Sequence, residues 1–144
     1  INLSSVIEHL ELPEQTIQLL NKKLVKDGLI IIKTPNWSSF ARIIFKKSWV
    51  HYDIPRHMYV FSFKNLRKLL TDKNFDVIHK IYSVNLGVEL KSFYRLLNIR
   101  RIPILHSLLL KLFLPLGFIL NLMSMSSTVT VIGKKIINGK NEIN

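Results

Sequence analysis

The 144-residue sequence contains no cysteine, few glycines and only nine acidic residues against 21 lysines and arginines. The absence of cysteine excludes disulfides, thiol nucleophiles, iron–sulfur clusters and zinc sites built on cysteine. No two of the five glycines stand at Gly-x-Gly spacing, so these residues hold no glycine-rich nucleotide-binding turn of that type. The shortage of acidic residues leaves a formal charge of +12, which predicts attraction to anionic partners.

Hydrophobic residues make up 48% of the sequence, which is enough for one domain with a core and argues against a disordered chain. Residues 1–9 have neither a basic segment nor a long apolar run, so no signal peptide is expected there. The pattern of apolar residues predicts alternating helices and strands. The predicted helices cover 13–26, a short piece around 40–45, and 62–74, and the predicted strands cover 29–32, 75–84 and 128–132. This order predicts an α/β fold with a covered sheet.

Six short motifs occur in a recognisable order along residues 3–82. They are Val6-Ile7-Glu8-His9-Leu10, Lys26-Asp27-Gly28-Leu29, Thr34-Pro35-Asn36, Pro55-Arg56-His57, Phe61-Ser62 and Asn74-Phe75-Asp76-Val77. Together they resemble the second half of class I S-adenosylmethionine-dependent methyltransferases. Within that superfamily they are most similar to the branch of ubiquinone-type O-methyltransferases and of enzymes that build cell-surface glycans and lipids.

This resemblance implies the C-terminal portion of a Rossmann-like methyltransferase sheet. Its strands would be numbers four, five, seven and six of the family in that spatial order, with strand seven antiparallel. The first three βα units, including the turn that grips the cofactor, have no counterpart in the sequence. Residues 1–144 are therefore expected to be the C-terminal part of a single domain, with a hydrophobic and basic insertion at about 86–125. Such a fragment is expected to be inactive without the N-terminal half of the same domain.

The resemblance also implies S-adenosyl-L-methionine as the cofactor and a pocket at the carboxyl ends of the strands. Four residues are then expected to bind the cofactor: Ser4, Ser5, Glu8 and His9. Five are expected to bind the acceptor: Asn36, Trp49, His51, Tyr52 and Tyr59. His57 is the candidate proton acceptor, because an imidazole titrates near neutral pH, and Arg56 stands beside it. No metal site is predicted.

Structural alternatives stay open for each of these assignments. Glu8 would also favour the start of a helix, with His9 packed at its side. Arg56 and His57 would also serve to tie their loop to backbone carbonyls. Trp49 and Tyr59 would also serve as core aromatics beneath the loop rather than as a stacking surface for a planar substrate.

Residues 102–123 approach the length of a membrane span, but Lys111 lies at their centre and the strand at 128–132 has to return to the sheet. The alternatives are a cover over the acceptor pocket, a subunit interface, or a helix lying on a membrane surface. Lys91, Arg95, Arg100 and Arg101 favour the last. We therefore expect peripheral membrane contact through residues 91–123 and a cytoplasmic location, at the inner membrane surface.

The expected function is methyl transfer to a small-molecule acceptor or to one linked to a lipid or glycan. One alternative is a non-catalytic basic module that docks to membranes. A second is a nucleic-acid-binding domain, to which the charge alone points. The lysines and arginines are scattered over every predicted element without a recognisable nucleic-acid-binding motif, so the charge supports only non-specific attraction.

Overall fold

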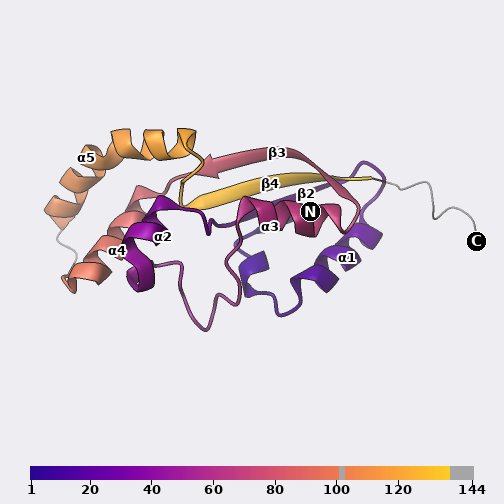
Figure 1. Cartoon of the computed structure of the whole chain (residues 1–144), viewed down its shortest axis with the longest axis horizontal. Coiled ribbons are helices and arrows are strands. Elements are labelled where there is room, and N and C mark those ends of the chain that lie inside the picture. The colour runs from indigo at the N-terminus through magenta and orange to yellow at the C-terminus, as the bar shows by residue number, and fades with distance from the viewer. Residues whose placement is uncertain (101–102, 137–144) are drawn as a thin grey trace, which may run out of the picture.

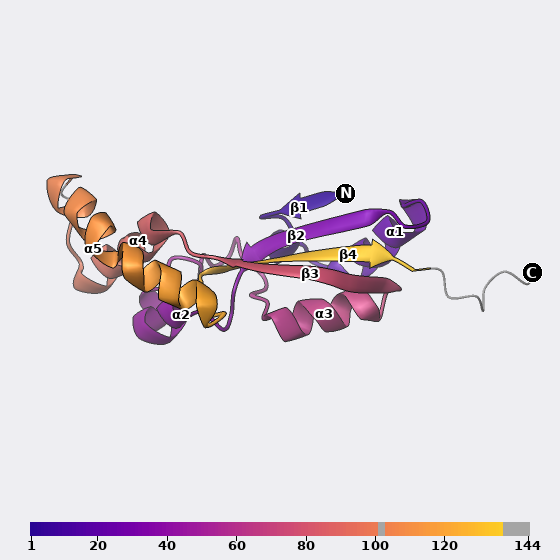
Figure 2. The same ribbon diagram turned by 90° about the horizontal axis from the view of Figure 1, so that it is seen from above.

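The computed structural model describes residues 1–100 and 103–136 and is built around a four-stranded sheet (Figure 1). The strands are β1 (Asn2–Ser4), β2 (Leu29–Pro35), β3 (Phe75–Ser83) and β4 (Thr128–Lys135). They lie side by side in the order β1-β2-β4-β3 (Figure 2). Strand β1 is parallel to β2, and β4 is antiparallel to both of its neighbours. The predicted strand order, with the last strand inserted antiparallel, is confirmed.

The helices are α1 (Pro13–Lys23), α2 (Phe40–Phe45), α3 (Phe63–Thr71), α4 (Leu86–Leu97) and α5 (Pro103–Leu122), with 3-10 turns η1 (Ile7–His9) and η2 (Lys46–Ser48). Helix α3 begins where predicted, because the Ser62 hydroxyl accepts a hydrogen bond from the backbone N–H of Asn65 at 3.2 Å. Helix α1 ends three residues earlier than the predicted 26. There the ammonium group of Lys135 donates to the carbonyls of Asn21 and Leu24, each at 2.7 Å, and the backbone leaves the helix.

Strand β2 is longer than the predicted 29–32 because β4 pairs with it along its whole length, from Leu29 opposite Lys134 to Pro35 opposite Thr128. Side chains alternate between the two faces of a strand. Ile30 and Ile32 therefore point together toward one face and are fully buried there, whereas Lys33 points to the other face and is exposed.

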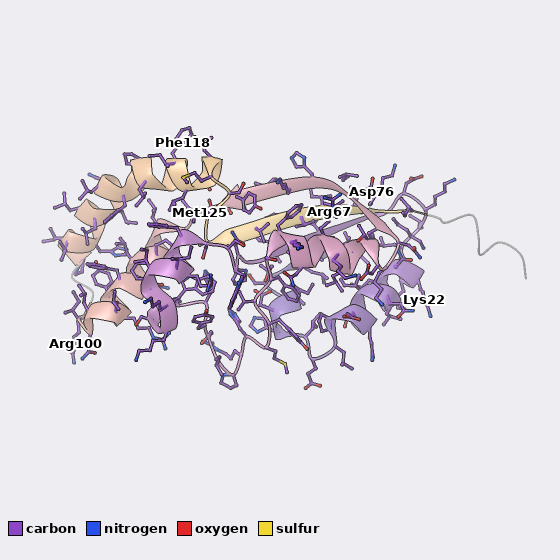
Figure 3. All side chains as sticks on the ribbon, viewed as in Figure 1. Lys22, Arg67, Asp76, Arg100, Phe118 and Met125 are labelled. Atoms are coloured by element: carbon purple, nitrogen blue, oxygen red, sulfur yellow. The ribbon has the colours of Figure 1, made fainter. Side chains whose placement is uncertain are left out.

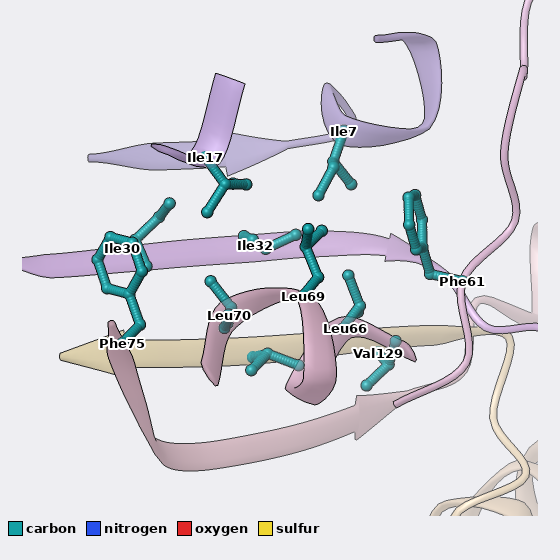
Figure 4. Close-up of a cluster of buried hydrophobic side chains, with 11 residues drawn as sticks. Ile7, Ile17, Ile30, Ile32, Phe61, Leu66, Leu69, Leu70, Phe75 and Val129 are labelled. Carbon is teal, nitrogen blue, oxygen red and sulfur yellow. The ribbon is translucent and has the colours of Figure 1, made fainter. Parts of the chain in front are cut away.

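The hydrophobic core lies between one face of the sheet and the pair α1 and α3, and Figure 4 shows side chains from the strands and the helices converging there. The core comprises Ile7, Ile17, Ile30, Ile32, Phe61, Leu66, Leu69, Leu70, Phe75, Val129 and Val131. Leu66, Leu69 and Leu70 lie on one face of α3 because residues three and four apart share a helix face. This packing holds the carboxyl ends of β1 and β2 in place.

Helices α2, α4 and α5 form a second group beyond the end of the sheet at which β1, β2 and β3 finish (Figures 1 and 2). Helix α5 lies within the apolar segment predicted at 102–123, and the chain then returns through β4 between β2 and β3. Figure 3 shows Phe118 projecting outward from α5, where its side chain is 66% exposed. The insertion therefore lies beside the carboxyl ends of the parallel strands, where ligands bind in open α/β sheets.

Candidate functional site

A cavity of about 740 Å³ lies at the carboxyl ends of the parallel strands. A volume of this size is within the range of small-molecule sites, roughly 300–1,000 Å³. Its polar lining residues are Ser5, Lys33, His51, Ser83, Asn85, Lys111 and Thr128. Ser5 reaches it because the backbone turns there in the left-handed region, with φ 53°, while its N–H still donates to the carbonyl of Lys33 at 2.8 Å.

A second, apolar cavity of about 240 Å³ lies between α2, α4 and α5. Its lining consists of Phe40, Ala41, Ile44, Phe45, Leu86, Glu89, Leu90, Phe93, Phe113, Leu116 and Leu120. Leu86, at the start of α4, lines both cavities. The cavity at the strand ends, called the polar cavity below because its lining includes these polar side chains among apolar ones such as Val84 and Leu110, therefore lies directly beside the apolar cavity of the insertion.

Glu89 is the one ionisable group in the lining of the apolar cavity. Burial raises the pKa of its carboxyl group to about 7, although a hydrogen bond from Ser127 acts in the opposite direction. One of its carboxylate oxygens is buried without a hydrogen-bond partner among the described residues. Sequence reasoning missed Glu89. The available signal was a single acid among Leu86, Leu90 and Phe93 on a helix that is otherwise apolar on that side.

Three of the predicted site residues, Glu8, His9 and His57, are brought together at the end of β1. The side chain of Glu8 is 1% exposed and accepts a hydrogen bond from the Thr34 hydroxyl at 3.0 Å. The rings of His9 and His57 meet edge to face, with their centroids 4.7 Å apart. Nδ1 of His9 lies 2.7 Å from the carbonyl of Arg56 and Nδ1 of His57 lies 2.8 Å from the carbonyl of His51.

His51 joins this cluster to the polar cavity, which it lines. Its ring stacks on that of His57 at 6.3 Å and meets the edge of Trp49 at 5.1 Å. Burial, with the nearby charge of His57, lowers the pKa of His51 to about 4, so this imidazole is neutral at physiological pH.

Other predicted site residues are occupied within the protein. Asn36 is fully buried, and its amide donates to the carbonyl of Ser126 at 2.9 Å while its carbonyl oxygen accepts from the N–H of Ser38 at 3.0 Å. Arg56 forms a surface ion pair with Asp53 at 2.5 Å. Asn36 and Arg56 therefore stabilise the loops in which they lie.

The aromatic candidates divide between core and surface. Trp49 is fully buried, and Tyr52 packs against its ring at 5.2 Å. The hydroxyl group of Tyr59, whose side chain is exposed, donates to the carbonyl of Glu11 at 3.1 Å. Ser4 is exposed, with its hydroxyl bonded to the side chain of Asn2 at 2.8 Å. Ser4, Trp49, Tyr52 and Tyr59 are not among the residues that line the polar cavity. Of the predicted site residues, Ser5 and His51 do line it.

The strand order, with an antiparallel strand inserted beside the parallel pair, defines a partial Rossmann-like methyltransferase fold. A solved S-adenosylmethionine-dependent methyltransferase from Thermotoga maritima, described as a possible histamine N-methyltransferase, matches with a TM-score of 0.60 at 15% identity, over 94% of this chain and 54% of that chain. One from Archaeoglobus fulgidus matches with a TM-score of 0.54 at 17% identity, over 93% of this chain and 57% of that one. This chain thus spans about half the length of those structures.

The family model described as a methyltransferase domain matches residues 1–80. The chain therefore belongs to this methyltransferase-domain family. A comparison with curated protein sequences gave no match. The predicted superfamily is confirmed, and the narrower branch stays a prediction.

S-adenosylmethionine is the cofactor that the family and the structural neighbours imply, and it supplies a methyl group bound to a sulfonium sulfur. The polar cavity presents hydroxyl, ammonium and amide groups from Ser5, Lys33 and Asn85. These donors fit a ligand that carries hydroxyl and carboxylate groups, as this cofactor does. Ser5 and Lys33 are the residues of this chain that would hold it.

Proposed function

We propose that this chain is the acceptor-binding half of a methyltransferase that acts on an acceptor with an apolar chain. The proposal depends above all on the junction at Leu86, where the polar cavity at the strand ends meets the apolar cavity of the insertion. A ligand with a polar reacting group and a hydrocarbon tail matches this pair of cavities. The apolar cavity excludes water from the tail, and the strand ends hold the reacting group.

The remainder of the cofactor site is proposed to come from strands and helices that pack on this sheet. Two observations support this. Among the described residues, β1 pairs only with β2, which leaves its other edge free for a further strand. In the described part of the chain, Lys33 and Ile81 on one sheet face are also exposed, whereas α1 and α3 cover the opposite face. A Rossmann-like sheet is covered on both faces.

Of the two catalytic candidates, His57 is the better placed. Arg56 directs its guanidinium group toward Asp53 at the surface. His57 is half-buried and stacks on His51, which lines the polar cavity. We propose that His57 acts at the reacting group of the acceptor and that Arg56 holds its loop through the carbonyl bound to His9.

We propose further that α5 lies on the inner surface of a membrane. By length and composition α5 could cross a bilayer, with a mean hydropathy of 1.9 and only 17% of it buried. The charged Lys111 at its middle and the return of the chain into β4 favour a helix that lies along the surface. Its exposed apolar side chains include Ile104, Leu108, Leu112, Phe118, Ile119 and Leu122. Apolar acceptor chains would enter the neighbouring cavity from this side.

Transfer of labelled methyl groups tests the proposed acceptor class. The full-length protein is incubated with radiolabelled S-adenosylmethionine and a cell extract that is then divided into lipid and aqueous fractions. Label is expected in the lipid fraction. Ala41, which is buried and lines the apolar cavity, is replaced in Ala41→Phe, and the filled cavity should lower that transfer at least tenfold.

The matched control is Ile43→Phe, which puts the same side chain at an exposed position of α2 outside the apolar cavity and should leave transfer unchanged. Label that enters only the aqueous fraction, or equal activity of Ala41→Phe and the original protein, would contradict the proposed acceptor class. Label in neither fraction would contradict the methyltransferase assignment itself.

A further inference from the structure

We propose that Glu8, His9 and His57 bind a first-row divalent transition-metal ion. Each offers one ligand atom, and these atoms all lie within 4.8 Å of one another. Bonds of about 2.1 Å at tetrahedral angles place each pair of ligand atoms roughly 3.4 Å apart. Side-chain movements of about 1–1.5 Å therefore close this cluster around an ion. Two imidazoles and one carboxylate form a ligand set that Zn²⁺, Fe²⁺ and Co²⁺ all accept.

The two imidazoles are already oriented as metal ligands are. A backbone carbonyl only accepts hydrogen bonds, so Nδ1 carries the proton in His9, facing Arg56, and in His57, facing His51. With Nδ1 engaged in this way, Nε2 is the nitrogen of each ring that can bind a metal. Ligating histidines almost always have their second nitrogen bonded to a carbonyl or carboxylate in this way.

The carboxylate of Glu8 supplies an independent reason for a cation at this place. Its side chain is 1% exposed and receives one hydrogen bond from Thr34. Among the described residues, no lysine, arginine or histidine nitrogen lies within 4.0 Å of its oxygens. A buried carboxylate without a positive partner is costly, and a bound divalent ion removes that cost.

The same loop is already joined to η1 by its backbone, which keeps the third ligand in reach. The carbonyl of Glu8 accepts from the N–H groups of Met58 at 2.8 Å and Tyr59 at 3.3 Å. His57 is thereby held next to Glu8 and His9 before any ion binds. The sequence predicted no metal site because the spacing between residues 9 and 57 corresponds to no local motif.

In the reaction, such an ion would polarise the oxygen of an acceptor hydroxyl and favour loss of its proton. His57 would then act through the ion, since its Nε2 would be bound to the metal. This role rests on the proposed function, whereas metal binding itself does not. The experiment therefore measures binding without cofactor or acceptor.

Titration of the full-length, metal-free protein with Co²⁺ tests the site through the visible absorption bands of the bound ion. One equivalent is expected to bind, and Zn²⁺ should displace it. Glu8→Gln, His9→Gln and His57→Gln should each weaken Co²⁺ binding at least tenfold. Thr34→Val, which removes only the hydroxyl that orients Glu8, should weaken it about tenfold, as loss of such outer partners does.

The matched control is His79→Gln, which removes an exposed imidazole on β3 and should leave Co²⁺ binding unchanged. Ring-nitrogen NMR of the unsubstituted protein gives a result that does not depend on whether the variants fold. Addition of Zn²⁺ should shift the signals of His9 and His57 and leave those of His51 and His79 in place. Absence of Co²⁺ bands, binding that survives all three ligand substitutions, or shifts confined to other histidines would overturn the proposal.

Discussion

The sheet with α1 and α3 and the group of α2, α4 and α5 are built in opposite ways. In the first region, eleven buried hydrophobic residues form one continuous cluster. In the second, apolar side chains cover the outside of α5, and the inside holds an apolar cavity of about 240 Å³. The first region buries its apolar surface within the chain, whereas the second presents apolar surface both outward and inward.

This difference separates stability from recognition. A closely packed core resists any change of volume, which keeps the strand ends and the Glu8 cluster in a fixed geometry. A region with an internal cavity and an exposed apolar helix contributes less to folding but offers sites for an apolar ligand and an apolar surface. The insertion thus provides the apolar surface and the apolar cavity for recognition, whereas the core provides stability.

The largest expected effect is on stability, from matched substitutions in the two regions. Phe75 is fully buried in the core, so Phe75→Ala should lower the free energy of unfolding by about 3–5 kcal/mol. Phe118 is 66% exposed, so Phe118→Ala should change it by less than about 0.5 kcal/mol. Denaturant unfolding of the full-length protein measures both, and equal losses would remove the contrast between the regions.

The next effect concerns membranes. Leu108 and Leu112 are 63% and 69% exposed on α5, and changing both to Ser should lower partition to vesicles that contain anionic lipid at least tenfold, about 1.4 kcal/mol. The control changes Val25 and Ile54, which are 75% and 79% exposed elsewhere, to Ser and should leave partition unchanged. Co-sedimentation measures both, and an equal loss in the control would show that α5 is not the contact.

The smallest effect is electrostatic. The carboxyl group of Glu89 has a folded-state pKa of about 7, above the ordinary 4.5, so the folded protein binds the proton more tightly than the unfolded chain. Stability should therefore fall as pH rises from about 4.5 to 7 and stay low above pH 7. Glu89→Gln should remove this decline and raise the free energy of unfolding at pH 8 by roughly 1 kcal/mol.

Denaturant unfolding between pH 4 and 8 measures the effect of Glu89→Gln. Glu14→Gln on the exposed start of α1 is the control and should leave the pH dependence as it is. An unchanged pH profile in Glu89→Gln would mean that Glu89 is not the group that titrates in the apolar cavity.

Local patterns sufficed to predict α1, α3, β2, β3 and β4 in the first region, whereas β1 was expected only from the family resemblance. The run from Leu29 to Ile32 predicted a strand because β-branched and apolar residues pack well on a covered sheet. The end of β2 at Pro35 could not be predicted from the neighbouring residues, because it depends on pairing with Thr128, far along the chain. The end of α1 likewise depends on Lys135, which caps helix carbonyls from another strand.

The site was predictable in part. The resemblance assigned Glu8 and His9 to the cofactor pocket and His57 to the loop over it, and the structure brings one ligand atom of each within 4.8 Å of the others. Asn36, which stands in one of those motifs, and Trp49 were also predicted to line the site, but both are fully buried. Burial depends on what packs over a residue, and single-residue patterns do not contain that information.

By itself, the sequence determined the succession of helices and strands, the basic charge and the methyltransferase character, because these depend on residue type and short-range order. Only the tertiary structure decided that Leu86 joins two cavities, that Glu89 titrates near neutrality and that two histidines direct their Nδ1 atoms to carbonyls beside a buried carboxylate. Those properties depend on contacts between residues far apart in the chain. These contacts form only when β4 pairs between β2 and β3.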